Sequence, residues 1–303
     1  MIRISDEVRE ALREGRAVVA LESTIVAHGM PYPDNLRTGQ LLEQTVRDHG
    51  AVPATIAVID GALAVGISAA ELERIASEKT VEKVSRRDLP FVIASRALGA
   101  TTVSATMIGA ARAGIAVFAT GGIGGVHREV NETFDISADL AELGRTNVCV
   151  VCAGAKSILD LPRTLEVLET LGVPVVGWGT NELPAFFTRT SGIALERRVD
   201  DAAQMARVLD AKWTLGLEGG VVLAVPPPES AALAQSDIDP VIAAALEKAH
   251  ALGIRGKATT PFLLREIREA TAGKSLATNI ALAVQNARVA AEVAVAYAAL
   301  RCR

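Results

Sequence analysis

Short runs of consecutive apolar residues that alternate with longer helical patterns constrain the fold of this chain most. The clearest runs are Ala17–Leu21, Thr55–Ile59, Ile115–Ala119, Asn147–Ala153, Val173–Val176 and Gly220–Val225. Because neighbouring positions are apolar, these runs are typical of strands that helices cover on both faces. The pattern predicts an α/β fold with three α/β/α layers around a mixed, mostly parallel central sheet.

Helical periodicity fills the intervals between these runs. The expected helices are Leu36–Asp48, Ala69–Ala76, Ser104–Ala113, Ile158–Leu171, Ala202–Leu215, Pro240–Ala251, Pro261–Ala270 and Ser275–Leu300. The one linker-like segment, Pro-Pro-Pro-Glu-Ser at 226–230, leads from the last expected strand to the C-terminal helices. A chain of 303 residues is long enough for one large buried core, so we expect a single domain over residues 1–303.

Charge and aromatic content argue against several classes of protein. The 31 Lys and Arg against 35 Asp and Glu give a net charge of −4, and aromatic residues make up 3%. Proteins that bind nucleic acid are commonly basic or stack bases on aromatic rings, so we expect no nucleic-acid partner. Three cysteines are too few for a disulfide framework, and no apolar stretch approaches the roughly 20 residues of a membrane span. We expect a cytoplasmic protein that does not bind membranes.

Two polar residues that follow expected strands could carry chemistry. Glu22 directly follows the run Ala17–Leu21, where partial desolvation would raise its pKa toward that of a general acid. A helix cap or a solvated loop acid would explain the same position. Lys156 lies between the run Asn147–Ala153 and an expected helix, and a helix N-terminus and apolar neighbours both disfavour its ammonium form. We expect a nucleophilic amine there, although a surface lysine fits the spacing too.

Glycines and acids after the run Ile115–Ala119 suggest an anion or metal site. Four glycines within residues 121–125 would let backbone N–H groups approach a phosphate, or simply form a turn. Asp135 and Asp139 are spaced to share one face of a helix, where they could bind Mg²⁺ or Mn²⁺. An N-cap with a nearby surface acid is the alternative interpretation of this pair.

Other motifs are less specific. Lys83, Arg86 and Arg87 could bind a phosphate or form a solvated charged run. Gly256-Lys257 lacks the other residues of a Walker A motif. Cys149 and Cys152 fall within one expected strand, where residues three apart face opposite sides, so they are not expected to share a metal.

Taken together, these motifs resemble pseudouridine-5′-phosphate glycosidases of the indigoidine synthase A-like family. The resemblance extends from about residue 5 to about residue 297, and the chain departs from the family pattern around Glu129–Glu132. The matching segments are Ala20–Ile25, His28–Pro31, Gly50–Ile56, Lys83–Pro90, Phe118–Arg128, Phe134–Leu140, Cys152–Asp160, Leu183–Phe187, Thr260–Leu264 and Asn279-Ile280.

The resemblance implies an α/β/α homotrimer that reversibly cleaves pseudouridine 5′-phosphate to uracil and ribose 5-phosphate with a divalent cation, usually Mn²⁺. It implies Lys156 as the nucleophile, Glu22 as the proton donor and Asp135 as the metal ligand. The implied substrate contacts are Lys83, Val103, Ser137, Ala138, Asp139 and Asn279.

The implied reaction breaks a carbon–carbon bond, and this explains the need for an amine. Ordinary glycosidases protonate a leaving oxygen or nitrogen with a carboxylic acid, but a leaving carbon has no lone pair to protonate. An amine can instead bind C1′ of a ring-opened ribose and expel uracil as a Schiff base forms. A lysine-dependent aldolase of sugar phosphates and a non-catalytic sugar-phosphate sensor remain the alternative functions.

Overall fold

The computed structural model describes residues 1–301, so Cys302 lies outside the described residues. Its strands are β1 (Ile2–Ile4), β2 (Val18–Leu21), β3 (Val52–Ile59), β4 (Ala62–Val65), β5 (Glu82–Val84), β6 (Gly99–Thr101), β7 (Val117–Ala119), β8 (Val126–His127), β9 (Cys149–Cys152), β10 (Leu159–Asp160), β11 (Val175–Trp178), β12 (Arg197–Val199) and β13 (Val221–Ala224).

The helices are α1 (Asp6–Arg13), α2 (Thr24–His28), α3 (Asp34–Asp48), α4 (Ala69–Ser77), α5 (Leu89–Ala94), α6 (Val103–Ala113), α7 (Val130–Thr133), α8 (Ala138–Leu143), α9 (Leu161–Thr170), α10 (Ala202–Thr214), α11 (Gln235–Ala251), α12 (Thr259–Ala270) and α13 (Lys274–Arg301). A short 3₁₀ helix, η1 (Gly256–Ala258), separates α11 from α12.

Within residues 1–301, eleven strands form one sheet in the order β1-β4-β3-β2-β7-β9-β13-β11-β12, and β6 joins β3 to β5 beside it. The pairs from β3 through β2, β7, β9, β13 and β11 to β12 are all parallel. Only β3–β4 and β3–β6 are antiparallel among the pairs of this described sheet. The prediction of a mixed, mostly parallel sheet is confirmed.

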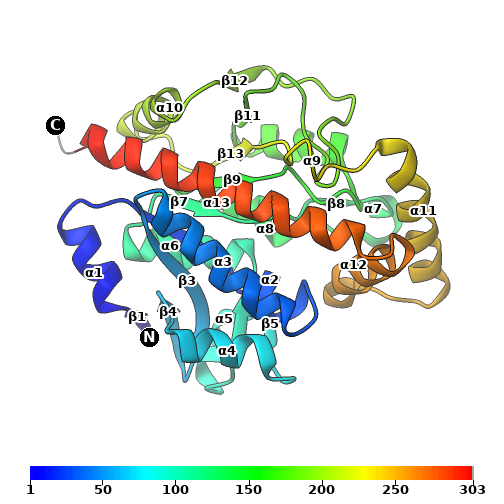
Figure 1. Cartoon of the computed structure of the whole chain (residues 1–303), viewed down its shortest axis with the longest axis horizontal. Helices are drawn as coiled ribbons and strands as arrows, with labels where there is room; N and C mark the ends of the chain where they lie inside the picture. The colour runs from blue at the N-terminus through cyan, green and yellow to red at the C-terminus, as the bar shows by residue number, and fades with distance from the viewer. Residues whose placement is uncertain (302–303) are drawn as a thin grey trace.

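Helices cover the sheet on both sides (Figure 1). The long helix α13 crosses one side against β2, β7 and β9, and α3 lies next to it. On the other side, α6 packs against β2, β3 and β7 and contacts α8. The residues of β2, β3 and β9 are buried throughout, because parallel strands between two helical layers have no solvent face.

All six expected strands are present, but the shorter edge strands escaped prediction. Both β1 and β5 have three residues and include exposed or charged side chains, so they lack an apolar run. The strand β4 follows β3 through Asp60 and Gly61, which both have positive φ. An Asp-Gly pair between apolar runs favours a tight hairpin, and this signal was not used in the sequence analysis.

Two expected helices begin three or more residues away from the predicted start. The helix expected from Ile158 begins as α9 at Leu161, because Leu159 and Asp160 pair with β8 as strand β10. The Asp160 side chain then accepts a hydrogen bond from the Arg163 N–H and caps α9. The helix expected from Pro240 begins at Gln235 and includes that proline.

Cys149 and Cys152 are buried in the central strand β9. Burial raises the pKa of the Cys149 thiol and raises that of Cys152 to about 12, so both remain protonated thiols. In residues 1–301 no helix is long and apolar enough to cross a membrane.

Candidate active site

A cavity of about 630 Å³ opens at the carboxyl edge of the parallel sheet. Its walls include residues that follow three neighbouring strands: Glu22 after β2, three glycines (121, 122 and 124) after β7, and Lys156 after β9. Ligands of open α/β sheets bind at this edge, so the strand order explains why residues distant in sequence converge. All nine predicted site residues line this cavity: Glu22, Lys83, Val103, Asp135, Ser137, Ala138, Asp139, Lys156 and Asn279.

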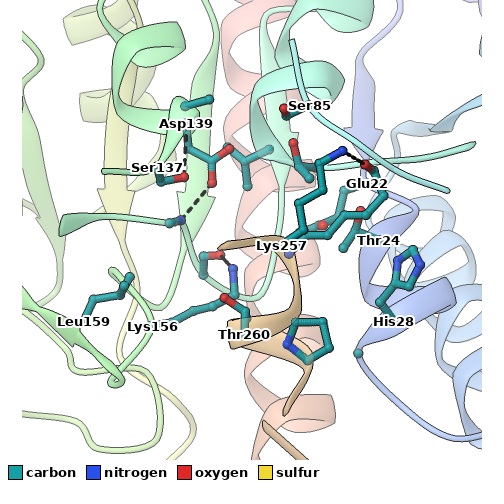
Figure 2. A pocket seen from close by; sticks show the side chains of 18 of the residues that line it. Glu22, Thr24, His28, Ser85, Ser137, Asp139, Lys156, Leu159, Lys257 and Thr260 are labelled. Atoms are coloured by element: carbon teal, nitrogen blue, oxygen red, sulfur yellow. Dashed lines mark hydrogen bonds between the residues drawn. The ribbon is translucent and has the colours of Figure 1, made fainter. Parts of the chain in front are cut away.

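The side chains enter the cavity from separate elements (Figure 2). In that view Glu22, Thr24 and His28 lie on one side, and Ser137 and Asp139 lie on the opposite side. Thr260 lies between these groups, on a segment that comes from the C-terminal third of the chain.

Glu22 is almost fully buried, with 8% of its surface exposed. Its Oε1 accepts a short hydrogen bond from Thr120 Oγ1. Burial raises the pKa of Glu22, although nearby Lys156 and the Thr120 hydroxyl oppose that rise. A carboxyl group with a raised pKa can hold a proton at higher pH and deliver it, as a general acid must.

Lys156 extends into the same cavity from the turn after β9. Its Nζ donates to the carbonyl oxygen of Gly122 at 2.6 Å, and its backbone N–H donates to Ile123 O at 3.1 Å. The turn contains Gly154 at φ +79, where a Cβ atom would lie 2.4 Å from Pro184 O, so only glycine fits. Because α9 begins only at Leu161, the expected helix N-terminus next to Lys156 is absent, and that part of the prediction was wrong.

Lys83 enters from β5, and Val103 is the first residue of α6. Burial lowers the pKa of Lys83, and the charge of Lys156 lowers it further. Two amines therefore face one cavity, and the charge of Lys156 disfavours the protonated form of Lys83. Lys83 is consequently a second candidate for proton transfer at this site.

The structure corrects the metal interpretation of Asp139. Its Oδ1 accepts the N–H of Ser104 and its Oδ2 accepts the N–H of Gly124, both at 2.9 Å. Asp135 precedes α8 and is not helical, so the two aspartates do not share a helix face. Asp139 instead joins the start of α6 to the glycine-rich turn, while Ser137 caps α8 by accepting the Asp139 N–H at 3.2 Å.

The glycine-rich turn is shaped by close packing. A Cβ atom on Gly124 would lie 2.2 Å from Ser137 Oγ and 2.7 Å from Asp139 Oδ2. The Gly124 N–H is already bonded to Asp139, so it is not free to bind a phosphate. The glycines therefore allow Asp139 to approach the turn. The sequence analysis had interpreted them as a phosphate-binding loop or as a simple turn.

Asp135 stands apart as a possible cation ligand. Its carboxylate is 37% exposed, lines the cavity, and lies 3.8 Å from His127 Nε2. Among residues 1–301 no three His, Cys, Asp or Glu side chains gather to hold a metal ion. Hard cations such as Mn²⁺ can retain several waters and bind one or two carboxylates. Asp135 therefore fits a largely hydrated divalent cation, but not one enclosed by protein ligands.

Sequence reasoning missed several other residues of the cavity wall. His28 belongs to the segment His28–Pro31, six residues after Glu22. Its Nε2 donates to Val81 O at 3.1 Å. Lys257 and Thr260 come from η1 and α12, which supply part of the cavity wall. Lys257 Nζ lies 2.7 Å from Asp88 Oδ1 and donates to Lys83 O at 3.2 Å. The 3₁₀ helix η1 thus contacts β5 and the residues after it.

The cavity wall is rich in formally cationic side chains. Among the described residues that line it, five are cationic and three are acidic. The cations are Lys83, Arg86, Arg87, Lys156 and Lys257, and the acids are Glu22, Asp135 and Asp139. Arg86 is held by the buried carboxylate of Glu142 at 2.7 Å. The excess of two positive charges contrasts with the net charge of −4 of the whole chain.

Comparisons with known proteins agree along almost the whole chain. The model of the indigoidine synthase A like protein family matches residues 7–296. A protein of Caldanaerobacter subterraneus subsp. tengcongensis named pseudouridine-5′-phosphate glycosidase is 58% identical over 97% of this chain and 96% of its own length. A protein of Deinococcus radiodurans with the same name is 58% identical over 98% of this chain and 95% of its own.

Solved structures agree with the sequence comparison. The prealnumycin C-glycosynthase AlnA in complex with ribulose 5-phosphate is 41% identical, with a TM-score of 0.92 over 100% of this chain and 98% of that one. An indigoidine synthase A-like protein from Thermotoga maritima is 35% identical, with a TM-score of 0.88 over 97% and 96% of the two chains. The extent of these matches shows that this chain belongs to the indigoidine synthase A-like family of enzymes.

Proposed function

We propose that this protein is a pseudouridine-5′-phosphate glycosidase, which reversibly cleaves the C1′–C5 bond to give uracil and ribose 5-phosphate. One observation carries the proposal: the parallel strands β2 and β9, which flank β7, bring a buried acid, Glu22, and an amine, Lys156, to one cavity. The names of the most similar relatives and the sugar phosphate bound to the C-glycosynthase support the same substrate class.

The first chemical step would open the ribose ring. Glu22 donates its proton to the ring oxygen as the C1′–O4′ bond breaks, and Lys156 Nζ forms a bond to C1′ with its lone pair. The attacking nitrogen then gives up one proton to the Glu22 carboxylate, which the first transfer left charged. The burial of Glu22 favours this role, because its raised pKa keeps a proton available.

The second step would release the base. The Nζ lone pair forms a C1′=N double bond, the electrons of the C1′–C5 bond pass to uracil, and C5 takes up the proton that Nζ released. Water then adds to the Schiff base, the C–N bond breaks, and ribose 5-phosphate leaves. The extra proton left on Nζ returns to the Glu22 carboxylate, which regenerates both the amine and the acid. Lys83 is close enough to influence both Glu22 and Lys156 electrostatically, so it can assist either proton transfer.

The 5′-phosphate would bind at the cationic end of the cavity. Arg86, Arg87 and Lys257 lie there, and the pairing of Arg86 with Glu142 orients its guanidinium. Arginine forks and lysine charges are the usual phosphate partners in proteins. The hydroxyl groups of Ser85 and Thr102 line the same wall and can donate further hydrogen bonds.

A divalent cation, Mn²⁺ by family resemblance, would bind Asp135. When bound, the ion would supply positive charge to the cavity wall at Asp135. Asp135→Asn is expected to abolish Mn²⁺ binding measured by electron paramagnetic resonance, as well as any activation by the metal. Unchanged Mn²⁺ affinity in this variant would exclude Asp135 as the ligand. The family further implies a homotrimer, and sedimentation equilibrium should give three times the mass of one chain.

The proposed activity can be tested with purified protein, pseudouridine 5′-phosphate and Mn²⁺. We expect uracil and ribose 5-phosphate to appear in equal amounts by chromatography, and Lys156→Ala to abolish both. Lys274→Ala is a suitable control, because this lysine begins α13 outside the cavity wall and should tolerate the change. Folded, metal-supplied wild-type protein without product would reject the proposal.

Two other functions predict different results in this assay. A lysine-dependent aldolase would form a Schiff base with a sugar phosphate but would release no uracil. A sugar-phosphate sensor would bind ribose 5-phosphate without turnover, and Lys156→Arg would leave that binding largely intact. The placement of a buried acid, Glu22, at the same cavity as the amine of Lys156 disfavours the sensor, since a buried acid is not needed merely to bind a sugar phosphate.

A further inference from the structure

Thr120 is the first residue after β7, and it lies directly behind the candidate acid. Its side chain is buried, with 4% of the residue exposed, and its Oγ1 donates to Glu22 Oε1. Behind this pair is a space of about 10 Å³ lined mainly by the apolar side chains of Leu21, Ile25 and Leu42. A space of that size holds about one water at most, so Thr120 is the main polar contact on that side.

Asn286 of α13 hydrogen-bonds to the backbone of Thr120. Its Nδ2 donates to Thr120 O at 2.8 Å and to Gly121 O at 3.3 Å, and the residue is fully buried. The neighbouring Gly122 O accepts the Lys156 Nζ hydrogen bond. Residues 120–122 therefore bind three different groups. Thr120 contacts Glu22, the carbonyls of residues 120 and 121 accept from Asn286, and Gly122 O accepts from Lys156.

We propose that Thr120 is the positioning residue of Glu22, and that Asn286 fixes Thr120 in place from α13. By binding Oε1, the hydroxyl leaves Oε2 as the oxygen that delivers the proton to the substrate. This inference rests on the proposed function, in which Glu22 opens the ribose ring.

The titration of Glu22 is a direct readout of this role. The charged groups that influence Glu22 are Lys156, Lys83 and Asp139, and Thr120 is the neutral donor among its partners. A donor to a carboxylate stabilises the charged form, so removing the hydroxyl should move the Glu22 titration to higher pH. A purely structural role of Thr120 would change stability without moving this titration.

The test compares Thr120→Val, which removes the hydroxyl at nearly constant shape, with Thr120→Ser, which keeps it. The titration is followed by infrared spectroscopy of the protonated carboxyl band, assigned by its loss in Glu22→Gln. We expect Thr120→Val to move the midpoint upward by about one pH unit. Its kcat should fall by about 10- to 100-fold with KM nearly unchanged. Thr120→Ser should stay within about threefold of the wild-type kcat.

An unmoved titration in folded Thr120→Val, or equal damage in Thr120→Ser, would overturn the proposal. If the valine variant does not fold, Thr120→Cys replaces it, because a thiol is a weak donor and should shift the midpoint above that of Thr120→Ser. Asn286→Leu should shift it in the same direction, and a wild-type titration there would refute the role of Asn286. The infrared readout does not need turnover, so failure of the proposed function in wild-type protein would be seen separately.

Discussion

Replacing Asp139 by asparagine tests how far the glycine-rich turn depends on one carboxylate. Asp139 is 6% exposed, and its two oxygens accept the N–H groups of Ser104 and Gly124 at 2.9 Å each. Asparagine keeps one acceptor and turns an NH₂ group toward the other N–H. A hydrogen bond to a charged acceptor is worth about 1.5–3 kcal/mol, and the orphaned donor adds a further cost. We expect Asp139→Asn to lower the free energy of unfolding by about 2–4 kcal/mol.

Equilibrium unfolding in urea, followed by circular dichroism, measures this change. Asp239→Asn is the matched control, because Asp239 is exposed on α11 and its replacement should change stability by less than about 0.5 kcal/mol. A stability of Asp139→Asn within about 0.5 kcal/mol of wild type would refute the reasoning, since the two bonds would then contribute almost nothing.

Three further variants test the binding and acid groups. Lys257→Met removes the cation next to Asp88, and the KM for pseudouridine 5′-phosphate should rise about tenfold in steady-state uracil release, with a smaller change in kcat. Glu142→Gln neutralises the partner of Arg86, so KM for the phosphorylated substrate should rise by about threefold to tenfold while that for pseudouridine stays constant. Glu22→Gln should abolish turnover yet stabilise the protein at neutral pH. Because burial raises the Glu22 pKa, the wild-type protein loses stability as pH rises through that value. The melting temperatures of wild type and Glu22→Gln should therefore be similar near about pH 4, and that of wild type should be the lower by about pH 8. The opposite pH trend would contradict the assignment.

Strand position identified the two central residues of the candidate site. Glu22 and Lys156 each follow a continuously apolar run, and parallel strands end at a common edge of their sheet. The linear sequence does not reveal that β2, β7 and β9 are neighbours, because that order depends on packing between distant segments. The edge strands were missed for a related reason, since short strands with one exposed face carry little apolar pattern.

The remaining wall of the cavity depends on tertiary contacts. Lys257 reaches the backbone of Lys83 across 174 residues, and no local motif indicates this contact. The spacing of Asp135 and Asp139 suggested one helical face, but the chain remains extended until α8 begins at Ala138. Asp139 then finds backbone donors on two other elements, and these bonds replace the metal that spacing alone suggested.

The central claim is that Lys156 Nζ forms a covalent bond to C1′ of the sugar. Reduction with sodium borohydride in the presence of ribose 5-phosphate, followed by peptide mass mapping, tests this claim most directly. We predict one stable pentose phosphate adduct on Lys156 and none in Lys156→Ala, with Lys83 unmodified. An adduct on Lys83, or none in protein that releases uracil, would contradict the claim.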